Sequence, residues 1–282
     1  MLNNLAEVKV EIILPNYNSE AYLDETINSI INQTFKNWKL IIVDGNSNDE
    51  TQRILQNYVQ HPNINVIRLK KNKRAGFCRN LAMRSSNSDY VAFIDSDDIW
   101  DREKLSKQLD FMIKNDYHFT YTNYLPFKYE KKWQDLKEIK PANIFTYEKF
   151  IRNTSIATST MIIKKSSIGN VKFSNTKICE DYFFKCKILK KVTYAYCLPK
   201  NLMRYRIRKD SLQSNKIRNF YWIWHINKNY NKMNFLNNLL SIFFISINSI
   251  KKYGFKLFNF IFFLYIEYSR KFFSLDIHFL YF

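Results

Sequence analysis

The sequence is poor in the residues that build flexible linkers. Its 282 residues include only four glycines and five prolines, whereas about 7% glycine is usual. Long glycine-rich linkers are therefore absent, and the length allows one large domain, or one domain with an appendage. The hydrophobic fraction of 46% and the aromatic fraction of 17% supply enough apolar side chains for a substantial core.

Cysteine is also scarce, and no two cysteines have the C-x-x-C spacing of a zinc ribbon or a thioredoxin motif. Scattered cysteines in a chain of this size are typical of a reduced, cytosolic protein. The first ten residues lack the apolar core of a signal peptide, so none is predicted. The four cysteines are Cys78, Cys179, Cys186 and Cys197.

Two phosphate-binding motifs are missing. The sequence contains no G-x-G-x-x-G and no G-x-x-x-x-G-K-[ST], so a Rossmann dinucleotide site and a P-loop both lose their main support.

Acidic residues are outnumbered. Lysine and arginine total 44 against 25 acids, which gives a net charge of +19. This balance favours anionic partners such as nucleic acid, an acidic lipid surface or a phosphorylated substrate. An AT-rich genome would also enrich lysine, so charge alone decides little. A basic nucleic-acid-binding protein is one alternative, but we expect no nucleic acid partner, because no recognised motif for one is present.

Strand-like and helix-like apolar patterns alternate along the first half of the chain. Strands are expected at 8–14, 38–43, 64–69, 90–94 and 118–124, with helical spacing between them. This alternation predicts an α/β fold with a parallel, doubly wound sheet. Farther on, residues 126–140 are predicted to be an excursion or mobile loop, 158–164 and 192–197 to be strands, and 178–184 to open a helix.

Three carboxylates follow the strand expected at 90–94, namely Asp95, Asp97 and Asp98. Open α/β sheets bind ligands at the carboxyl ends of their strands, where Asn16 and Asp44 would also lie. Acids this close repel one another unless a cation shares them. The pattern therefore favours a metal or phosphate site. The alternative is an Asp-rich turn that caps the next helix, where Asp101 could serve as the cap.

The C-terminal region changes in character. Residues 234–250 and 255–266 are apolar and helical in spacing, with lysines between them, and neither has about 18 apolar residues free of polar ones. Such helices suit a membrane interface, which predicts a cytoplasmic protein held peripherally on the inner face of the cytoplasmic membrane. The alternatives are an appendage packed on the catalytic domain and a contact in a homo-oligomer.

Five motifs in order resemble family 2 glycosyltransferases with the GT-A fold: L-P-N-Y-N-S-E, V-D-G-N-S-N-D-E-T, R-A-G-F-C-R-N, F-I-D-S-D-D-I-W and C-E-D-Y. The resemblance is close over 8–100 and moderate to about residue 214. It implies a mostly parallel central sheet flanked by helices. The catalytic domain would cover 1–214, divided into a nucleotide-sugar half (about 1–100) and an acceptor half (about 101–214), with a helical C-terminal region at 215–282.

The resemblance also implies roles for particular residues. Asp97 would bind Mg²⁺ or Mn²⁺, and Asp181 would be the general base for the acceptor hydroxyl, with Glu180 orienting it. Asp44 would bind the base of the nucleotide. The remaining donor-binding residues would be Pro15, Asn16, Tyr17, Arg79, Asp95, Ser96, Asp98, Arg206 and Arg208, and Ser211 would lie near the diphosphate.

The implied reaction is an inverting transfer of a sugar from a nucleotide-sugar, with UDP-hexose or UDP-N-acetylhexosamine favoured. The acceptor would be a glycan or a lipid-linked glycan in surface polysaccharide synthesis. A metal-dependent nucleotidyltransferase is the alternative enzyme. Two departures from the family pattern are Asp44-Gly45 in place of two aspartates, and Arg208-Lys209 where the family often has histidine.

Overall fold

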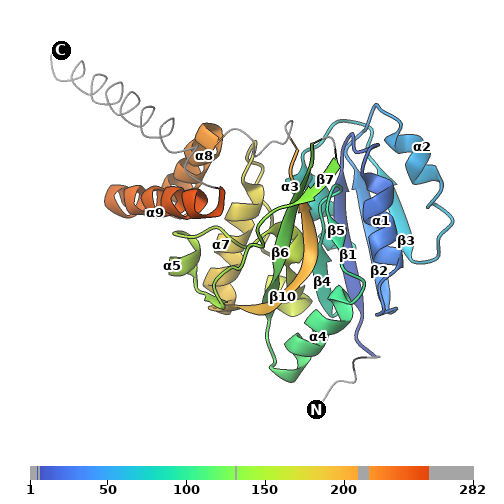
Figure 1. Cartoon of the computed structure of the whole chain (residues 1–282), viewed down its shortest axis with the longest axis horizontal. Helices are drawn as coiled ribbons and strands as arrows, with labels where there is room; N and C mark the ends of the chain where they lie inside the picture. The colour runs from blue at the N-terminus through green and yellow to red at the C-terminus, as the bar shows by residue number, and fades with distance from the viewer. Residues whose placement is uncertain (1–4, 6, 131, 209–215, 254–282) are drawn as a thin grey trace.

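The structure is a computed structural model that describes residues 5, 7–130, 132–208 and 216–253. Within them, ten strands form one sheet with helices on both faces (Figure 1). The strands are β1 Val10–Asn16, β2 Trp38–Asp44, β3 Ile64–Arg68, β4 Tyr90–Phe93, β5 Ile99–Trp100, β6 Phe119–Glu130, β7 Lys132–Asp135, β8 Ile144–Phe145, β9 Ile162–Lys164 and β10 Ala195–Arg206. The helices are α1 Leu23–Ile31, α2 Thr51–Gln56, α3 Ala75–Arg84, α4 Lys104–Lys114, α5 Tyr147–Phe150, the 3₁₀ helix η1 Thr158–Thr160, α6 Lys165–Ile168, α7 Glu180–Val192, α8 Lys216–Asn229 and α9 Phe235–Tyr253.

The sheet has the order β3-β2-β1-β4-β9-β6-β10-β5. Its first half, β3-β2-β1-β4, is parallel throughout, as the alternating pattern predicts. Strand β9 then runs antiparallel to both β4 and β6, while β6 and β10 are parallel to each other. The sheet is therefore mixed rather than purely parallel, and its carboxyl edge is best defined over the first four strands.

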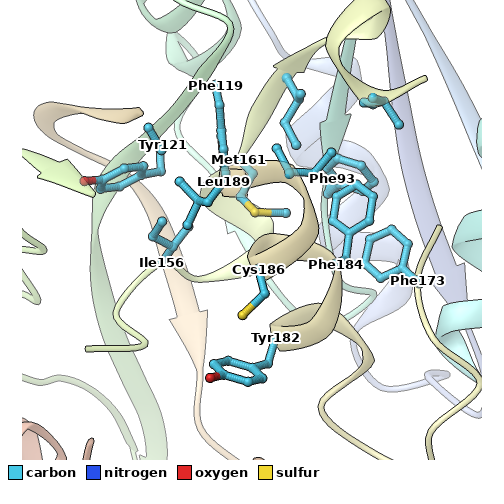
Figure 2. Close-up of a cluster of buried hydrophobic side chains, with 14 of the residues drawn as sticks. Phe93, Phe119, Tyr121, Ile156, Met161, Phe173, Tyr182, Phe184, Cys186 and Leu189 are labelled. Atoms are coloured by element: carbon cyan, nitrogen blue, oxygen red, sulfur yellow. The ribbon is translucent and has the colours of Figure 1, made fainter. Parts of the chain in front are cut away.

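Strand β1 is buried on both faces because each face carries its own core. Ile12 and Leu14 belong to the cluster beneath α1 and α4, whereas Ile13 belongs to the cluster beneath α3 and α7, as the two-residue period of a strand requires. Figure 2 shows the second cluster, in which the rings of Phe173 and Phe184 stack with centroids 4.0 Å apart.

The predicted loop at 126–140 is wrong. Strand β6 continues through Pro126 to Glu130, and β7 returns antiparallel to it. Two side chains explain the added pairing: Phe127 is buried, and its ring lies 5.2 Å from that of Trp133. The hairpin thus has an apolar anchor, which the many charges of the segment obscure.

Two strand predictions are also wrong in their limits. Residues 158–160 form a 3₁₀ helix instead of a strand, and the Thr160 hydroxyl donates to the Ala157 carbonyl at 2.6 Å, a local bond that competes with strand pairing. Val192 ends α7, and β10 runs from Ala195 through Arg206. Strand β10 therefore carries both Arg204 and Arg206 within the sheet.

Helices α8 and α9 lie at the end of the molecule opposite α2, next to α7 (Figure 1). A buried polar network joins them to α7 and to Ile151. Asn227 accepts from the Tyr182 hydroxyl at 2.7 Å and donates to Ser241 at 3.1 Å, and Ser241 in turn donates to the Ile151 carbonyl. The structure thus shows α8 and α9 packed on the rest of the chain through α7 and Ile151.

The apolar stretch expected at 255–266 lies outside the described residues, as does Ser211. Among the helices that are described, none is both long and apolar enough to cross a membrane.

Candidate active site

The carboxyl ends of three parallel strands meet on one edge. Asn16 at the end of β1 pairs in register with Asp44 at the end of β2. The N–H of Ile94 donates to the Ile13 carbonyl at 3.1 Å, so the segment that follows β4 begins beside β1. Residues distant in sequence are therefore gathered where a doubly wound sheet binds its ligands.

Asp44 is completely buried, and its carboxylate is held by protein donors. Oδ1 accepts from the Asn16 amide at 2.7 Å, and Oδ2 accepts from the Ser47 N–H at 3.0 Å. The Ser47 hydroxyl and the Gln52 amide add one bond each. The Asp44 carboxylate therefore fixes the loop after β2 to the end of β1. This structural role is additional to its predicted contact with a nucleotide base.

The two neighbours of Asn16 differ in exposure. Pro15 is buried in β1, whereas 45% of Tyr17 is exposed at the rim of the edge. Opposite them, a Cβ added to Gly45 would lie 2.7 Å from the Lys73 carbonyl oxygen. Glycine at 45 therefore allows the loop before α3 to approach β2, which is the physical reason that a second aspartate does not fit there.

Asp95 makes contacts on two sides, one through its carboxylate and one through its backbone N–H. Its carboxylate, 31% exposed, forms an ion pair with Arg79 Nη2 at 2.6 Å, and its backbone N–H donates to Ser159 Oγ at 3.0 Å. The next residue, Ser96, shares a hydrogen bond of 2.6 Å with the hydroxyl of Ser19. The turn is thus tied to α3, η1 and the segment after β1.

Asp97 and Asp98 occupy different environments. The Asp97 carboxylate is 20% exposed and lies 3.1 Å from Arg208 Nε, and burial raises its pKa to about 6 against the lowering effect of that arginine. Asp98 is almost fully buried, accepting from the Ser159 hydroxyl and from the Arg206 N–H. Burial and the two neighbouring carboxylates raise the pKa of Asp98 well above its usual range. Asp98 therefore braces the turn, while Asp97 remains accessible.

Arg206 is enclosed rather than extended toward solvent. Its guanidinium lies 4.6 Å from the ring centroid of Phe127 and 4.7 Å from those of Tyr22 and Trp133, and it forms an ion pair with Glu25. Its Nη1 is a buried donor without a partner among the described residues. The segment predicted to be a loop is therefore the β6–β7 hairpin, whose aromatic side chains hold this arginine beside the acidic turn.

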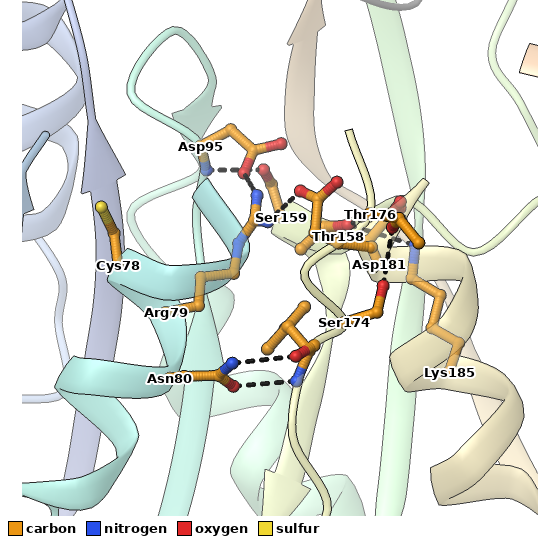
Figure 3. A network of polar contacts seen from close by, with 12 residues as sticks. Cys78, Arg79, Asn80, Asp95, Thr158, Ser159, Ser174, Thr176, Asp181 and Lys185 are labelled. Carbon is orange, nitrogen blue, oxygen red and sulfur yellow. Dashed lines mark hydrogen bonds and ion pairs between the residues drawn. The ribbon is translucent and has the colours of Figure 1, made fainter. Parts of the chain in front are cut away.

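Arg79 links the two halves of the site (Figure 3). It donates through Nη2 to Asp95 at 2.6 Å and through Nη1 to Glu180 at 2.7 Å, and 5% of its side chain is exposed. Its guanidinium also lies 5.2 Å from the ring centroid of Phe173. Burial raises the pKa of Glu180, and Arg79 opposes that effect. The arginine thus fixes the acid after β4 relative to the acid that opens α7.

Two residues beside Arg79 make this close approach possible. A Cβ on Gly76 would lie 2.8 Å from the Ser174 carbonyl oxygen and 2.9 Å from Glu180 Cγ. The Asn80 amide bonds both backbone groups of Phe173, donating to its carbonyl at 2.9 Å and accepting from its N–H at 2.8 Å. The R-A-G-F-C-R-N motif at the start of α3 therefore allows the segment from Phe173 to Glu180 to pack closely against this helix.

Asp181 is held by its own helix and by η1. Its Oδ2 accepts from the Lys185 ammonium at 2.7 Å and from the Thr158 hydroxyl at 3.1 Å. Burial alone would raise the pKa of Asp181, but Lys185 and, less strongly, Arg79 lower it to about 2. The carboxylate is therefore ionised at neutral pH, as a general base must be.

A cavity of about 170 Å³ opens between these groups and the C-terminal helices. Asp95 and Asp181 both line it, and its apolar walls include Phe220, Ile223 and Ile245 from α8 and α9. A cavity of roughly 150 Å³ holds a benzene ring, so this one has room for a single six-membered ring. It has carboxylate oxygens on one side and an apolar surface on the other.

Comparison with known proteins agrees with this geometry. The family model described as "Glycosyl transferase family 2" matches residues 11–172, more than half of the chain. The chain belongs to glycosyltransferase family 2. It is 32% identical over 244 residues to TuaG of Bacillus subtilis, a glycosyltransferase assigned to teichuronic acid biosynthesis, covering 86% of this chain and 96% of that protein.

A second relative of this family 2 glycosyltransferase is WfgD of Escherichia coli, a UDP-Glc:α-D-GlcNAc-diphosphoundecaprenol β-1,3-glucosyltransferase. The two are 30% identical over 253 residues, which is 87% of this chain and 95% of WfgD. The E. coli protein WfaP carries the same description and is 29% identical.

Solved structures confirm the GT-A fold. Residues 1–349 of S. aureus TarS in complex with UDP-GlcNAc match with a TM-score of 0.66 at 21% identity, covering 87% of this chain and 73% of that one. The match covers 44% of the longer TarS chain. The mannosyltransferase PcManGT from Pyrobaculum calidifontis, in complex with GDP-Man and Mn²⁺, matches with a TM-score of 0.64 at 14% identity, covering 84% and 70% of the two chains.

The acidic turn of this glycosyltransferase offers a partial site for a divalent cation. Among the described residues, no group of three or more carboxylate, cysteine or histidine side chains forms a complete metal cage. Asp97 is partly exposed, and burial, with a smaller contribution from the charge on Asp95, raises its pKa against the opposing effect of Arg208. A cation would relieve the repulsion between the two carboxylates. Hard oxygen ligands from one or two carboxylates, completed by substrate phosphates, are what Mg²⁺ commonly uses. The residues fit a cation that arrives with the nucleotide.

Several residues of the site escaped the sequence analysis. Lys185 stands four residues after Asp181 in a helix, a spacing that places the two side chains together, so it could have been found. Ser159 and Thr158 carry no such indication, because their contacts with Asp98 and Asp181 depend on a 3₁₀ turn distant in sequence. Gly76 was part of a recognised motif, but its steric role needs the position of Ser174.

Proposed function

We propose that this glycosyltransferase transfers a hexose or an N-acetylhexosamine from its UDP derivative to a hydroxyl of a lipid-linked glycan, with inversion at the anomeric carbon, in surface polysaccharide synthesis. The observation that carries the proposal is the cavity that Asp95 and Asp181 share. Because both carboxylates line one cavity, it supports a meeting of donor sugar and acceptor hydroxyl there, with Asp181 as the base.

The donor side rests on the carboxyl edge of the sheet. UDP would bind along the ends of β1 and β2, near Asn16, Asp44 and the exposed ring of Tyr17. Arg208, two residues after the end of β10, would meet the diphosphate beside Asp97. WfgD is described as using UDP-Glc, and TarS was solved with UDP-GlcNAc, which supports a uridine nucleotide.

On the acceptor side we propose a general base, with no covalent intermediate between sugar and enzyme. Asp181 would accept the proton of the acceptor hydroxyl, whose oxygen then forms a bond to the anomeric carbon. The bond from that carbon to the diphosphate oxygen breaks, and its electron pair leaves with UDP. One displacement of this kind inverts the configuration, and holding both reactants in one cavity supplies much of the rate.

Asp97 would hold a divalent cation, with Asp95 nearby. When bound, Mg²⁺ or Mn²⁺ would offset the charge that develops on the departing diphosphate. Asp98, buried against Ser159, would contribute by shaping the turn. PcManGT was solved with Mn²⁺, which supports a cation of this class.

The C-terminal helices suggest where a lipid-linked acceptor would come from. Exposed apolar side chains gather on α9, where Phe235 is 71%, Leu236 62% and Phe243 56% exposed, and Lys251 and Lys252 stand at its end. Apolar faces with basic ends suit the surface of an anionic membrane. We therefore place the enzyme peripherally on the inner face of the cytoplasmic membrane, with the cavity wall of α8 and α9 facing the acceptor.

The donor is identified by a panel of nucleotide-sugars with Mn²⁺, read first by thermal shift, because a bound ligand stabilises the folded state, and then by nucleoside diphosphate release. We expect a UDP-sugar to give the largest shift and to release UDP only with an acceptor present. Release of pyrophosphate instead would identify a nucleotidyltransferase. NMR of the product tests inversion, and co-sedimentation with anionic vesicles tests membrane attachment.

A further inference from the structure

A second basic side chain, that of Lys185, is buried on the acceptor side of the site in addition to that of Arg79. Lys185 lies on α7 with 3% of its side chain exposed. Its ammonium is 2.7 Å from Asp181 Oδ2 and 3.1 Å from Thr158 Oγ1, so these three groups form a closed triangle (Figure 3). Lys185 and Asp181 both line the cavity.

We propose that Lys185 is a positioning residue that holds the Asp181 carboxylate in its anionic form and in one orientation toward the acceptor. This inference rests on the proposed function for its catalytic meaning. With Oδ2 occupied by Lys185 and Thr158, the proton of the acceptor hydroxyl is accepted on Oδ1.

Burying a lone lysine or a lone carboxylate is costly, so an ion pair this deep requires partners on both sides. Asp181 and Lys185 are four residues apart on α7, a spacing of about one helical turn that brings two side chains together on one face. The Thr158 hydroxyl, on η1, binds both members and prevents the pair from rotating as a unit. The orientation of Asp181 is therefore set by its own helix α7 and by η1 rather than by the acceptor.

The other charges near the pair balance one another. Glu180 on α7 and Asp95 after β4 face Arg79 of α3, and Arg218 of α8 acts on the adjacent Cys179. Arg79 is already shared between two carboxylates, whereas Lys185 contacts Asp181 directly. Consistent with that division, Lys185 has a larger effect than Arg79 in lowering the pKa of Asp181.

This arrangement has a consequence for turnover. A carboxylic acid formed beside an ammonium is destabilised, since a nearby cation favours the charged form. After Asp181 takes the acceptor proton, it releases that proton quickly to water, and the base is ready for the next acceptor. Lys185 thus makes Asp181 a weaker base but speeds its return to the ionised form.

The direct test is the titration of the Asp181 carboxyl carbon by NMR, assigned by comparison with Asp181→Asn. In the wild-type protein we expect no inflection above about pH 3, where an ordinary aspartate would titrate near 3.9. An inflection at or above about 4 in the wild-type protein would overturn the inference, and this measurement needs no variant at position 185 to fold.

Variants extend the test to activity. In Lys185→Met we expect the carboxyl inflection to rise by at least about 1.5 pH units and the acid limb of kcat/KM to rise with it. Lys185→Arg should restore the wild-type limb, and Lys187→Met, on the face of α7 that lines a different groove, should leave it unchanged. A folded Lys185→Met with an unshifted carboxyl titration contradicts the inference. If no transfer is found at all, the titration still decides the role of Lys185, so the two proposals fail separately.

Discussion

Arg79 carries the strongest single prediction, because one buried side chain joins the donor and acceptor halves. In Arg79→Met, both hydrogen bonds to Asp95 and Glu180 are lost, and two partly buried carboxylates remain without their cation. Removing one partner of a buried ion pair costs about 3–5 kcal/mol. The two carboxylates are 31% and 17% exposed, so water compensates in part, and we expect a loss near the lower end.

In a chain of this size each kcal/mol lowers Tm by roughly 2–4 °C, so Arg79→Met should unfold about 6–12 °C below the wild type. Because the two acids would no longer be held together, kcat/KM should fall by about 100-fold. Arg79→Lys retains the charge, but one ammonium cannot span both carboxylates, so its kcat/KM should fall nearly as far while its Tm recovers. Differential scanning calorimetry and a UDP-release assay measure the two effects.

The matched control is Arg84→Met, at the exposed end of the same helix, which should change neither quantity. If Arg79→Met keeps the wild-type Tm and kcat/KM, the guanidinium does not couple the two halves, and the geometry of the site has been misinterpreted.

Two further predictions concern other charges. Burial lowers the pKa of Lys104 to about 7, so above that pH the unfolded chain binds more protons than the folded one, and stability should rise from pH 7 toward 10. Lys104→Met should remove this rise and stabilise the protein below pH 7 by on the order of 4 kcal/mol, measured by urea unfolding at pH 6 and 9.5; an unchanged pH dependence would contradict it. Asp97→Asn should weaken Mn²⁺-dependent UDP binding by more than about tenfold, since a charged ligand is lost, whereas Asp98→Asn, whose carboxyl is turned inward, should change it by less than about threefold in calorimetric titration. Equal losses in the two variants would mean that burial does not separate their roles.

The sequence predicted the parallel half of the sheet well because each strand there is apolar on both faces and ends in a polar turn. The burial of Ile12, Ile13 and Leu14 leaves little freedom in where β1 runs. The same logic placed Asn16, Asp44 and Asp95 on one edge, since parallel strands expose their carboxyl ends together. These are local patterns, and local patterns can be read from one chain.

The remainder depends on contacts between distant segments. The β6–β7 hairpin forms because Phe127 and Trp133 enclose Arg206, and nothing within the segment shows that such a partner exists. Likewise Asp98 looks the same as Asp97 in sequence, and only the position of Ser159 turns one inward. The pairing of Arg79 with Glu180 spans 101 residues and follows from the close approach of Gly76 on α3 to the start of α7.

The most direct test of the central claim is acceptor-dependent UDP release by the wild-type enzyme and by Asp181→Asn, using a UDP-sugar, Mn²⁺ and a lipid-linked glycan acceptor. Loss of a positioned general base typically costs about 10²–10⁴-fold in rate. We therefore expect UDP release by Asp181→Asn to fall within that range while its affinity for UDP, measured by calorimetry, stays at the wild-type value. A variant that transfers sugar at the wild-type rate would contradict the account.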